Sequence, residues 1–176
     1  MTETLHIEIV RRAELSPHRY QEVLALCERA YHEDLSHLMA TFDDPTHVLG
    51  YLDGELVSHA LWIARTLTYQ GMPLRCAYVE AVATEPRYQG RGYASHVLRT
   101  LAAAIASFDV GALSPSDPAY YTRLGWEQWQ GPLAVATGEG VTPTPDEEVM
   151  ILRLPNTPPL DLHEGLIAPW RVGEIW

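Results

Sequence analysis

A strongly apolar segment, LRCAYVEAVAT (74–84), runs directly into a glycine-containing turn, RYQGRGYA (87–94). The first segment predicts a buried strand, and the turn is followed by a pattern that predicts a helix over 93–108. A strand, a glycine turn and a helix in this order place consecutive backbone N–H groups at a helix N-terminus, which suits a bound anion. The apolar face of the predicted helix consists of Val97, Leu98, Leu101, Ile105 and Phe108.

Three phosphate-binding patterns can be compared with this turn. Arg87, Gly90 and Gly92 match R-x-x-G-x-G, in which the backbone cradles a pyrophosphate. A P-loop requires a lysine, but all 12 basic residues of this chain are arginines. A dinucleotide fingerprint requires glycine or alanine where this chain has Ser95. The alternative to a cradle is a tight turn that only closes a strand–helix unit.

The rest of the pattern predicts a mixed α/β or α+β sheet in one domain spanning 1–176. The chain is expected to turn at Asp53-Gly54 within a hairpin over 47–67. Ser16 is the expected N-cap of a helix over 16–35, and Asp117 begins a short helix that stops at Gly125. The tail, 156–176, is too aromatic for a disordered end. Further strands are predicted at 6–10, 109–114, 132–137 and 147–154, with a loop rich in proline, threonine and acids before the last of them.

Composition restricts the partners. The formal net charge is −11, which disfavours binding to nucleic acid and anionic membranes and favours binding to cations, although solubility alone also explains it.

The start of the chain lacks a signal pattern and no apolar run approaches a membrane span, so we expect a cytoplasmic protein. The absence of lysine excludes Schiff-base chemistry. Cys27 and Cys76 are expected as small buried side chains. The eight histidines lack zinc-like spacing, so we expect solvated or capping roles and no metal.

About thirty residues after the turn comes AYYTRLGW (119–126), an aromatic pair before a Leu-Gly-aromatic stop. Together with the strand, turn and helix, this segment resembles the GNAT N-acetyltransferase superfamily. The resemblance covers roughly 74–126. It implies a GNAT fold, with a mixed, mostly antiparallel central sheet flanked by helices, and acetyl-coenzyme A bound at the glycine turn.

A closer resemblance rests on four segments, and it runs from about Val48 to Trp176. Read together, they look like the aminoglycoside 2'-N-acetyltransferases, in which a Trp-Arg-x-Gly-acid-x-Trp sequence closes the chain. The resemblance implies acetyl transfer to the 2'-amine of an aminoglycoside by direct attack on the thioester, and a homodimer. The segments are 74–84, GALSPSDPAYYTRLGW (111–126), GPLAVATGEGVTPTPDEE (131–148) and WRVGEIW (170–176).

Two side chains are candidates for the chemistry. Glu80 is a lone acid in an apolar run and is the expected proton acceptor; the alternative is a solvated strand residue. Tyr121 is the expected acid for the departing thiolate; the alternative is core packing of both rings of the tyrosine pair. In the resemblance, Val82 and Thr84 pair with pantetheine, and a backbone N–H near Ala81 faces the thioester oxygen. The expected cofactor-binding residues are Val82, Ala83, Thr84, Arg87, Gln89, Gly90, Arg91, Gly92, Tyr93 and Ala94.

A polycationic acceptor needs carboxylates around it, and several are candidates, although those at 146–148 also suit an ordinary charged loop. Packing of Trp170 and Trp176 would hold a terminal carboxylate near the acceptor. Alternative functions are acetylation of another small polyamine or aminosugar, or a non-catalytic sensor of acyl-coenzyme A or a cationic drug. The candidate acceptor-binding residues are Asp34, Glu80, Ser114, Asp146, Glu147, Glu148, Glu174 and Trp176.

Overall fold

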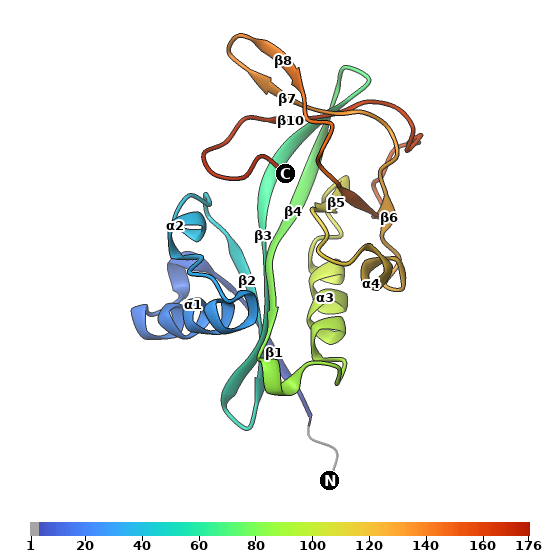
Figure 1. Ribbon diagram of the computed structural model, residues 1–176. Coiled ribbons are helices and arrows are strands. Elements are labelled where there is room, and N and C mark those ends of the chain that lie inside the picture. Colours follow the sequence, from blue (N-terminus) through green and yellow to red (C-terminus); the bar gives the residue numbers. More distant parts are fainter. Residues whose placement is uncertain (1–3) are drawn as a thin grey trace. The chain divides into compact units, whose positions relative to one another are not determined.

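The computed structural model describes residues 4–176 (Figure 1). These residues divide into two compact units. The first unit contains the chain up to Ile63 together with Val79–Ala104. The second contains Ala64–Tyr78 and Ile105–Trp176. Two long strands, β3 (Glu55–Tyr69) and β4 (Met72–Thr84), contribute residues to both units.

The first unit is built on antiparallel strands. β1 (His6–Arg11) pairs with β2 (Thr46–Leu52), and β2 pairs with the beginning of β3, with the chain turning at Asp53-Gly54 as predicted. Helix α3 (Tyr93–Ala104) packs on β2 and buries Val97, Leu98 and Leu101. The remaining helical segments are η1 (Arg12–Glu14), α1 (Pro17–Tyr31), α2 (Ser36–Met39) and η2 (Pro86–Tyr88).

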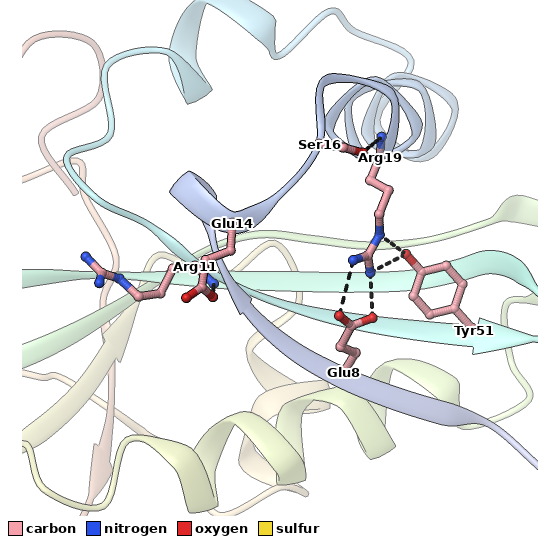
Figure 2. A network of polar contacts seen from close by, with 6 residues as sticks. All are labelled: Glu8, Arg11, Glu14, Ser16, Arg19 and Tyr51. Carbon is pink, nitrogen blue, oxygen red and sulfur yellow. Dashed lines mark hydrogen bonds and ion pairs between the residues drawn. The ribbon is translucent and has the colours of Figure 1, made fainter.

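Helix α1 begins as the sequence predicts and ends earlier. The Ser16 hydroxyl accepts a hydrogen bond from the Arg19 N–H at 3.3 Å, which caps the helix. The Arg19 guanidinium also donates to Glu8 at 2.5 Å and to the Tyr51 hydroxyl at 3.0 Å, so α1 is tied to β1 and β2 (Figure 2). His32 adopts a left-handed φ of 57° and ends α1 at Tyr31, so the predicted helix over 16–35 is too long.

The second unit contains strands in the order β6-β9-β5-β4-β3-β10-β7-β8. The β4–β5 and β10–β7 pairs are parallel, and the other described pairs are antiparallel, which confirms a mixed, mostly antiparallel sheet. Helix α4 (Pro118–Thr122) begins after Asp117, whose carboxylate accepts a hydrogen bond from the Tyr120 N–H. The strands not yet given are β5 (Val110–Leu113), β6 (Glu127–Gln128), β7 (Leu133–Thr137), β8 (Gly140–Pro143), β9 (Met150–Arg153) and β10 (Leu166–Pro169).

Some elements differ from the sequence prediction. The loop after β7 is partly strand, since β8 folds back on β7. The tail supplies β10, which pairs with both β3 and β7. α3 ends at Ala104 rather than at Phe108. Within residues 4–176, no helix is both long and apolar enough to cross a membrane.

Two histidines lie in the core of the first unit, contrary to the prediction of solvated or capping histidines. His47 and His59 are each 0% exposed. Their Nδ1 and Nε2 atoms, respectively, are 2.9 Å apart. Burial lowers the pKa of His59 to about 4, and burial, His59 and Arg12 lower the pKa of His47 to about 3. Cys27 lies beside this pair, and it is buried and free, as predicted, like Cys76.

Gly131 permits a close approach of two chain segments in the second unit. A Cβ placed there would lie 2.0 Å from the Glu164 carbonyl oxygen. We expect Gly131→Ala to lower the free energy of unfolding by about 1–3 kcal/mol, because backbone atoms must move to relieve this overlap. Gly138→Ala is the matched control, since its Cβ would meet nothing within 4 Å. Denaturant unfolding of both variants tests this, and equal stabilities would contradict it.

The buried histidine pair predicts a pH dependence of stability. The folded-state pKa values are below the value of about 6.5 expected in the unfolded chain, so the unfolded state binds more protons as the pH falls below 6.5. We therefore expect the free energy of unfolding to fall by about 2–4 kcal/mol between pH 7.5 and 5, with little change above that range. Denaturant titrations at several pH values measure this. A variant with both histidines changed to leucine should lose most of the slope, and a flat wild-type profile would contradict the prediction.

Candidate functional site

The backbone of β4 departs from regular strand geometry beside the candidate base. Glu80 is half-buried, and the next residue, Ala81, has φ +50°. A non-glycine residue in this left-handed region carries strain and persists only where surrounding contacts hold it. Cys76–Val79 are all buried, whereas Glu80, Ala81 and Val82 are all half-buried. The strain therefore lies at the residue predicted to face the thioester.

Side chains from other elements bond to consecutive carbonyl groups after Glu80. The Ala81 oxygen is 2.8 Å from His59 Nδ1, and the Val82 oxygen accepts a hydrogen bond of 2.8 Å from the Tyr31 hydroxyl. The Ala83 oxygen accepts from Ser58 at 3.3 Å. Each carbonyl oxygen has two lone pairs, so these bonds leave acceptor capacity for an extended ligand along the strand.

The glycine turn after β4 has the conformation that an anion cradle requires. Gly90 and Gly92 have φ values of +76° and +86°, and a Cβ on either would meet no atom within 4 Å. The first backbone bond within α3 runs from the His96 N–H to the Gly92 oxygen at 3.1 Å. The N–H groups of Gly92, Tyr93 and Ala94 precede it, in the first turn of the helix, where backbone N–H groups have no intrahelical partner. This open, N–H-rich turn fits a pyrophosphate.

The side chains predicted to bind the cofactor around the turn make several different contacts within the protein. Gln89 reaches back to the Thr84 carbonyl oxygen at 3.2 Å, and Arg87 forms an ion pair with Glu55. Arg87 and Arg91 lie over the Tyr88 ring, 4.9 and 5.2 Å from its centroid. Tyr93 and Ala94, both half-buried, start α3. Arg91 is the exposed arginine of this turn that makes no ion pair within residues 4–176.

Tyr121 lies in the second unit, on α4. It is 6% exposed, and its ring meets those of Tyr120 and Trp126 edge-on, with centroids 5.2 and 6.2 Å apart. Burial, followed by Tyr120 and Asp117, raises the pKa of Tyr121 to about 12. Tyr121 therefore stays protonated at neutral pH and can donate a hydrogen bond. Ser114, the exposed residue after β5, is the other predicted residue in this part of the unit.

Apart from the half-buried Glu80, the candidate acceptor-binding acids are exposed, and most of these carboxylates have no partner within residues 4–176. Asp34 is an exception, because its carboxylate accepts a hydrogen bond of 2.8 Å from the N–H of Ser36, the first residue of α2. This bond lowers the pKa of Asp34. The other acids make no ion pair within the described part of the chain, so their charge is available to a cation; they are Asp146, Glu147, Glu148 and Glu174.

The tail is ordered by contacts within the second unit. Trp176 is 2% exposed, and its indole donates to the Thr144 hydroxyl at 2.9 Å. This bond joins the tail to the loop that carries the acids at 146–148. Trp170 is 57% exposed, so of the two tryptophans expected to pack and hold the tail, Trp176 is buried and Trp170 is not. β10 ends at Pro169, and the next N–H group, that of Trp170, still donates to the Ala136 carbonyl of β7 at 2.9 Å.

Two arginines that the sequence analysis did not single out surround a buried tyrosine. Arg65 and Arg171 lie over the ring of Tyr78, 4.6 and 5.3 Å from its centroid. Arg65 also donates to the Pro169 carbonyl at 3.1 Å, and Arg171 donates to the Glu174 carbonyl. The arginine of the terminal Trp-Arg motif therefore holds the tail against β4. His59 was also missed, because one histidine in an apolar run resembles ordinary core.

Comparisons with known proteins agree with this fold and turn. A family model described as "Acetyltransferase (GNAT) domain" matches residues 11–129. The chain is similar to an aminoglycoside 2'-N-acetyltransferase of Mycolicibacterium fortuitum, with 38% identity over 70% of this chain and 67% of that protein.

Solved structures show the same fold at low sequence identity. The GNAT family N-acetyltransferase YhbS of Escherichia coli, in complex with CoA, matches with a TM-score of 0.66 and 14% identity over 96% of this chain and 91% of that one. A GNAT family acetyltransferase of Brucella melitensis, in complex with acetyl-CoA, matches with a TM-score of 0.62 and 16% identity over 93% and 95%. For Eis1 of Mycobacterium abscessus the TM-score is 0.61 and the identity 19%, over 72% of this chain but 34% of that one. The family match and the fold together establish that the chain belongs to the GNAT acetyltransferases.

Proposed function

We propose that this protein transfers the acetyl group of acetyl-CoA to the 2'-amine of an aminoglycoside, by direct attack of the amine on the thioester. Acetyl transfer is the activity of the GNAT family to which the chain belongs. The finer proposal rests mainly on one observation, the 38% identity to an aminoglycoside 2'-N-acetyltransferase. The unpaired acids of the second unit support a cationic acceptor.

GNAT acetyltransferases use acetyl-CoA, which supplies an acyl group activated as a thioester. The backbone N–H groups of 89–94 hold its pyrophosphate, and Arg91 adds a positive charge beside them. Val82 and Thr84 pair with the pantetheine amides along the strand. The left-handed Ala81 turns the backbone of β4 next to Glu80, and in this proposal the N–H groups at 81–82 polarise the thioester carbonyl.

Glu80 accepts a proton from the acceptor amine in this proposal. An aminoglycoside amine is largely protonated at neutral pH and cannot attack until the proton leaves. Glu80 is half-buried within an apolar strand, next to the residues proposed to bind the thioester.

Tyr121 stabilises the departing sulfur by donating a hydrogen bond. Its pKa of about 12 lies well above the value of about 8.5 for a free thiol. Complete transfer of its proton to a thiolate is therefore uphill, whereas a hydrogen bond from a protonated phenol carries no such penalty. This role differs from the full acid predicted from the sequence.

The acceptor binds through several carboxylates in this proposal. The exposed acids at 146–148 and Glu174 attract the cationic sugar, and Ser114 and Asp34 complete the set of candidates. One exposed ion pair contributes little, but several around one polycation add up.

From the family resemblance we also infer a homodimer in the cytoplasm. Equilibrium sedimentation at micromolar concentration would show a monomer alone if the dimer is wrong.

The acceptor class is tested with purified protein, acetyl-CoA and a panel of amines, with thiol release as the readout. We expect turnover with aminoglycosides that carry a 2'-amine and at least tenfold lower kcat/KM with analogues that have a 2'-hydroxyl. Mass spectrometry and NMR of the product locate the acetyl group. Turnover only with simpler polyamines or aminosugars would replace the acceptor, and binding without any turnover would favour a sensor.

Glu80→Gln tests the proton acceptor. We expect kcat/KM at pH 7 to fall by about 10²-fold, and the loss to shrink at high pH, where the amine is already neutral. A pH–rate profile measures both effects. Glu139→Gln, in the exposed turn between β7 and β8, is the control and should match wild type. A Glu80→Gln profile identical to wild type would remove Glu80 from this role.

The bond between tail and acid loop is tested by Trp176→Phe, which keeps a buried ring but removes the donor to Thr144. We expect the KM for the aminoglycoside to rise by about threefold to tenfold, the effect of losing one neutral hydrogen bond, with the KM for acetyl-CoA unchanged. Thr144→Val removes the same bond from the other side. The double variant should therefore be no worse than either single one, and additive losses would contradict a shared bond.

A further inference from the structure

One residue of β4 is held in a conformation that its own side chain disfavours. Ala81 has φ +50° although it carries a Cβ, and it directly follows Glu80. Such a conformation returns to the extended region unless neighbouring contacts prevent it. A neighbouring group must therefore hold Ala81 in this conformation.

The hydrogen bond at the Ala81 carbonyl determines the protonation of two imidazoles. A carbonyl oxygen only accepts, so His59 Nδ1, 2.8 Å away, must carry a proton. The neutral His59 ring then has a lone pair on Nε2, and His47 Nδ1, 2.9 Å from it, must be the donor. Two histidines on neighbouring strands, β2 and β3, thus form one directed chain of hydrogen bonds that ends at Ala81.

The His47 end of this series of hydrogen bonds has an unsatisfied nitrogen. His47 Nε2 is buried and has no hydrogen-bond partner within residues 4–176. Its surroundings are the edge of the Tyr20 ring, with centroids 6.2 Å apart, and the charge of Arg12. A buried polar pair with an open end is a poor way to stabilise a core, since apolar side chains would fill the same space without an orphaned nitrogen. The pair is better explained by the hydrogen bond that His59 donates to the Ala81 carbonyl.

We propose that His59, backed by His47, is a positioning residue that holds Ala81 left-handed and thereby directs the Glu80 carboxylate and the neighbouring backbone N–H groups. Tyr31 holds the next carbonyl, that of Val82, at 2.8 Å. The backbone is therefore fixed by side chains from β3 and α1 at two consecutive residues after Glu80. This inference rests on the proposed function, in which Glu80 is the proton acceptor.

The tautomers provide a test that does not depend on activity. Nitrogen-15 NMR of the wild-type protein at pH 7 should show His47 and His59 neutral, each with its proton on Nδ1. A proton on Nε2 of His59 would mean that the Ala81 carbonyl receives no bond from it, and would overturn the proposal.

Two substitutions of His59 then separate positioning from packing. His59→Leu removes the donor, whereas His59→Asn retains an N–H donor near the position of Nδ1. We expect His59→Leu to lower kcat at least tenfold with less than a twofold change in the KM for acetyl-CoA, and His59→Asn to recover most of the loss. Val23→Ala, a buried change in α1, should lower stability without lowering kcat. The proposal fails if His59→Leu keeps kcat within twofold of wild type, or if His59→Asn is no better than His59→Leu.

The double variant of Glu80→Gln with His59→Leu distinguishes this inference from the proposed function. If His59 acts through Glu80, the double variant should be no slower than Glu80→Gln alone, whereas independent losses that multiply would overturn the positioning role. A fully active Glu80→Gln would instead refute the proton acceptor, whatever His59 does. A slow Glu80→Gln beside a fully active His59→Leu would refute the positioning role alone.

Discussion

The hydrogen bond from His59 to the Ala81 carbonyl is the contact on which the geometry of β4 depends. A regular strand would alternate its side chains through Glu80, Ala81 and Val82, and would turn each of their N–H groups into the sheet ladder. Ala81, with its left-handed φ, departs from that geometry directly after the residue that carries the carboxylate. His59 Nδ1 bonds to the Ala81 carbonyl at this point, and His47 Nδ1 bonds in turn to His59 Nε2. The remaining nitrogen, His47 Nε2, is buried without a hydrogen-bond partner within residues 4–176.

The same strand also anchors the tail. β4 enters from the second unit, where the guanidinium groups of Arg65 and Arg171 lie over Tyr78. Arg171 belongs to the terminal segment, and its bond to the Glu174 carbonyl shapes the last residues. The Trp176 indole then donates a hydrogen bond to Thr144, in the loop that carries the acids at 146–148. Residues distant in sequence are thus organised by contacts with one strand and one loop.

The charge distribution explains how a protein of net charge −11 keeps acids available. Half of its 12 arginines neutralise acids in ion pairs that tie elements together, such as Arg19 with Glu8 and Arg29 with Glu85. The acids at 146–148 and Glu174 lie outside these pairs. These unpaired acids are available to a cationic ligand.

Local signals in the sequence were sufficient for most elements. Ser16 and Pro17 determined the start of α1, Asp53-Gly54 the hairpin, and Asp117 the start of α4, since caps and turns depend on residues within one turn of the chain. The glycine turn and its helix were also predictable, because positive φ and a helix N-terminus are local properties. Strand β10 was not, since the apolar residues of 166–168 become a strand only where β3 and β7 offer unpaired backbone groups.

The sequence was enough to predict the glycine turn, the lone acid at Glu80 and the family resemblance, because each is a matter of residue type at a short spacing. Tertiary structure alone decided that His59 and His47 meet, that Ala81 is left-handed, that Tyr121 is buried enough to raise its pKa to about 12, and that Trp170 is exposed while Trp176 is buried. These outcomes depend on which distant segments pack together. Burial and hydrogen-bond direction are properties of that packing, and no short stretch of residues carries them.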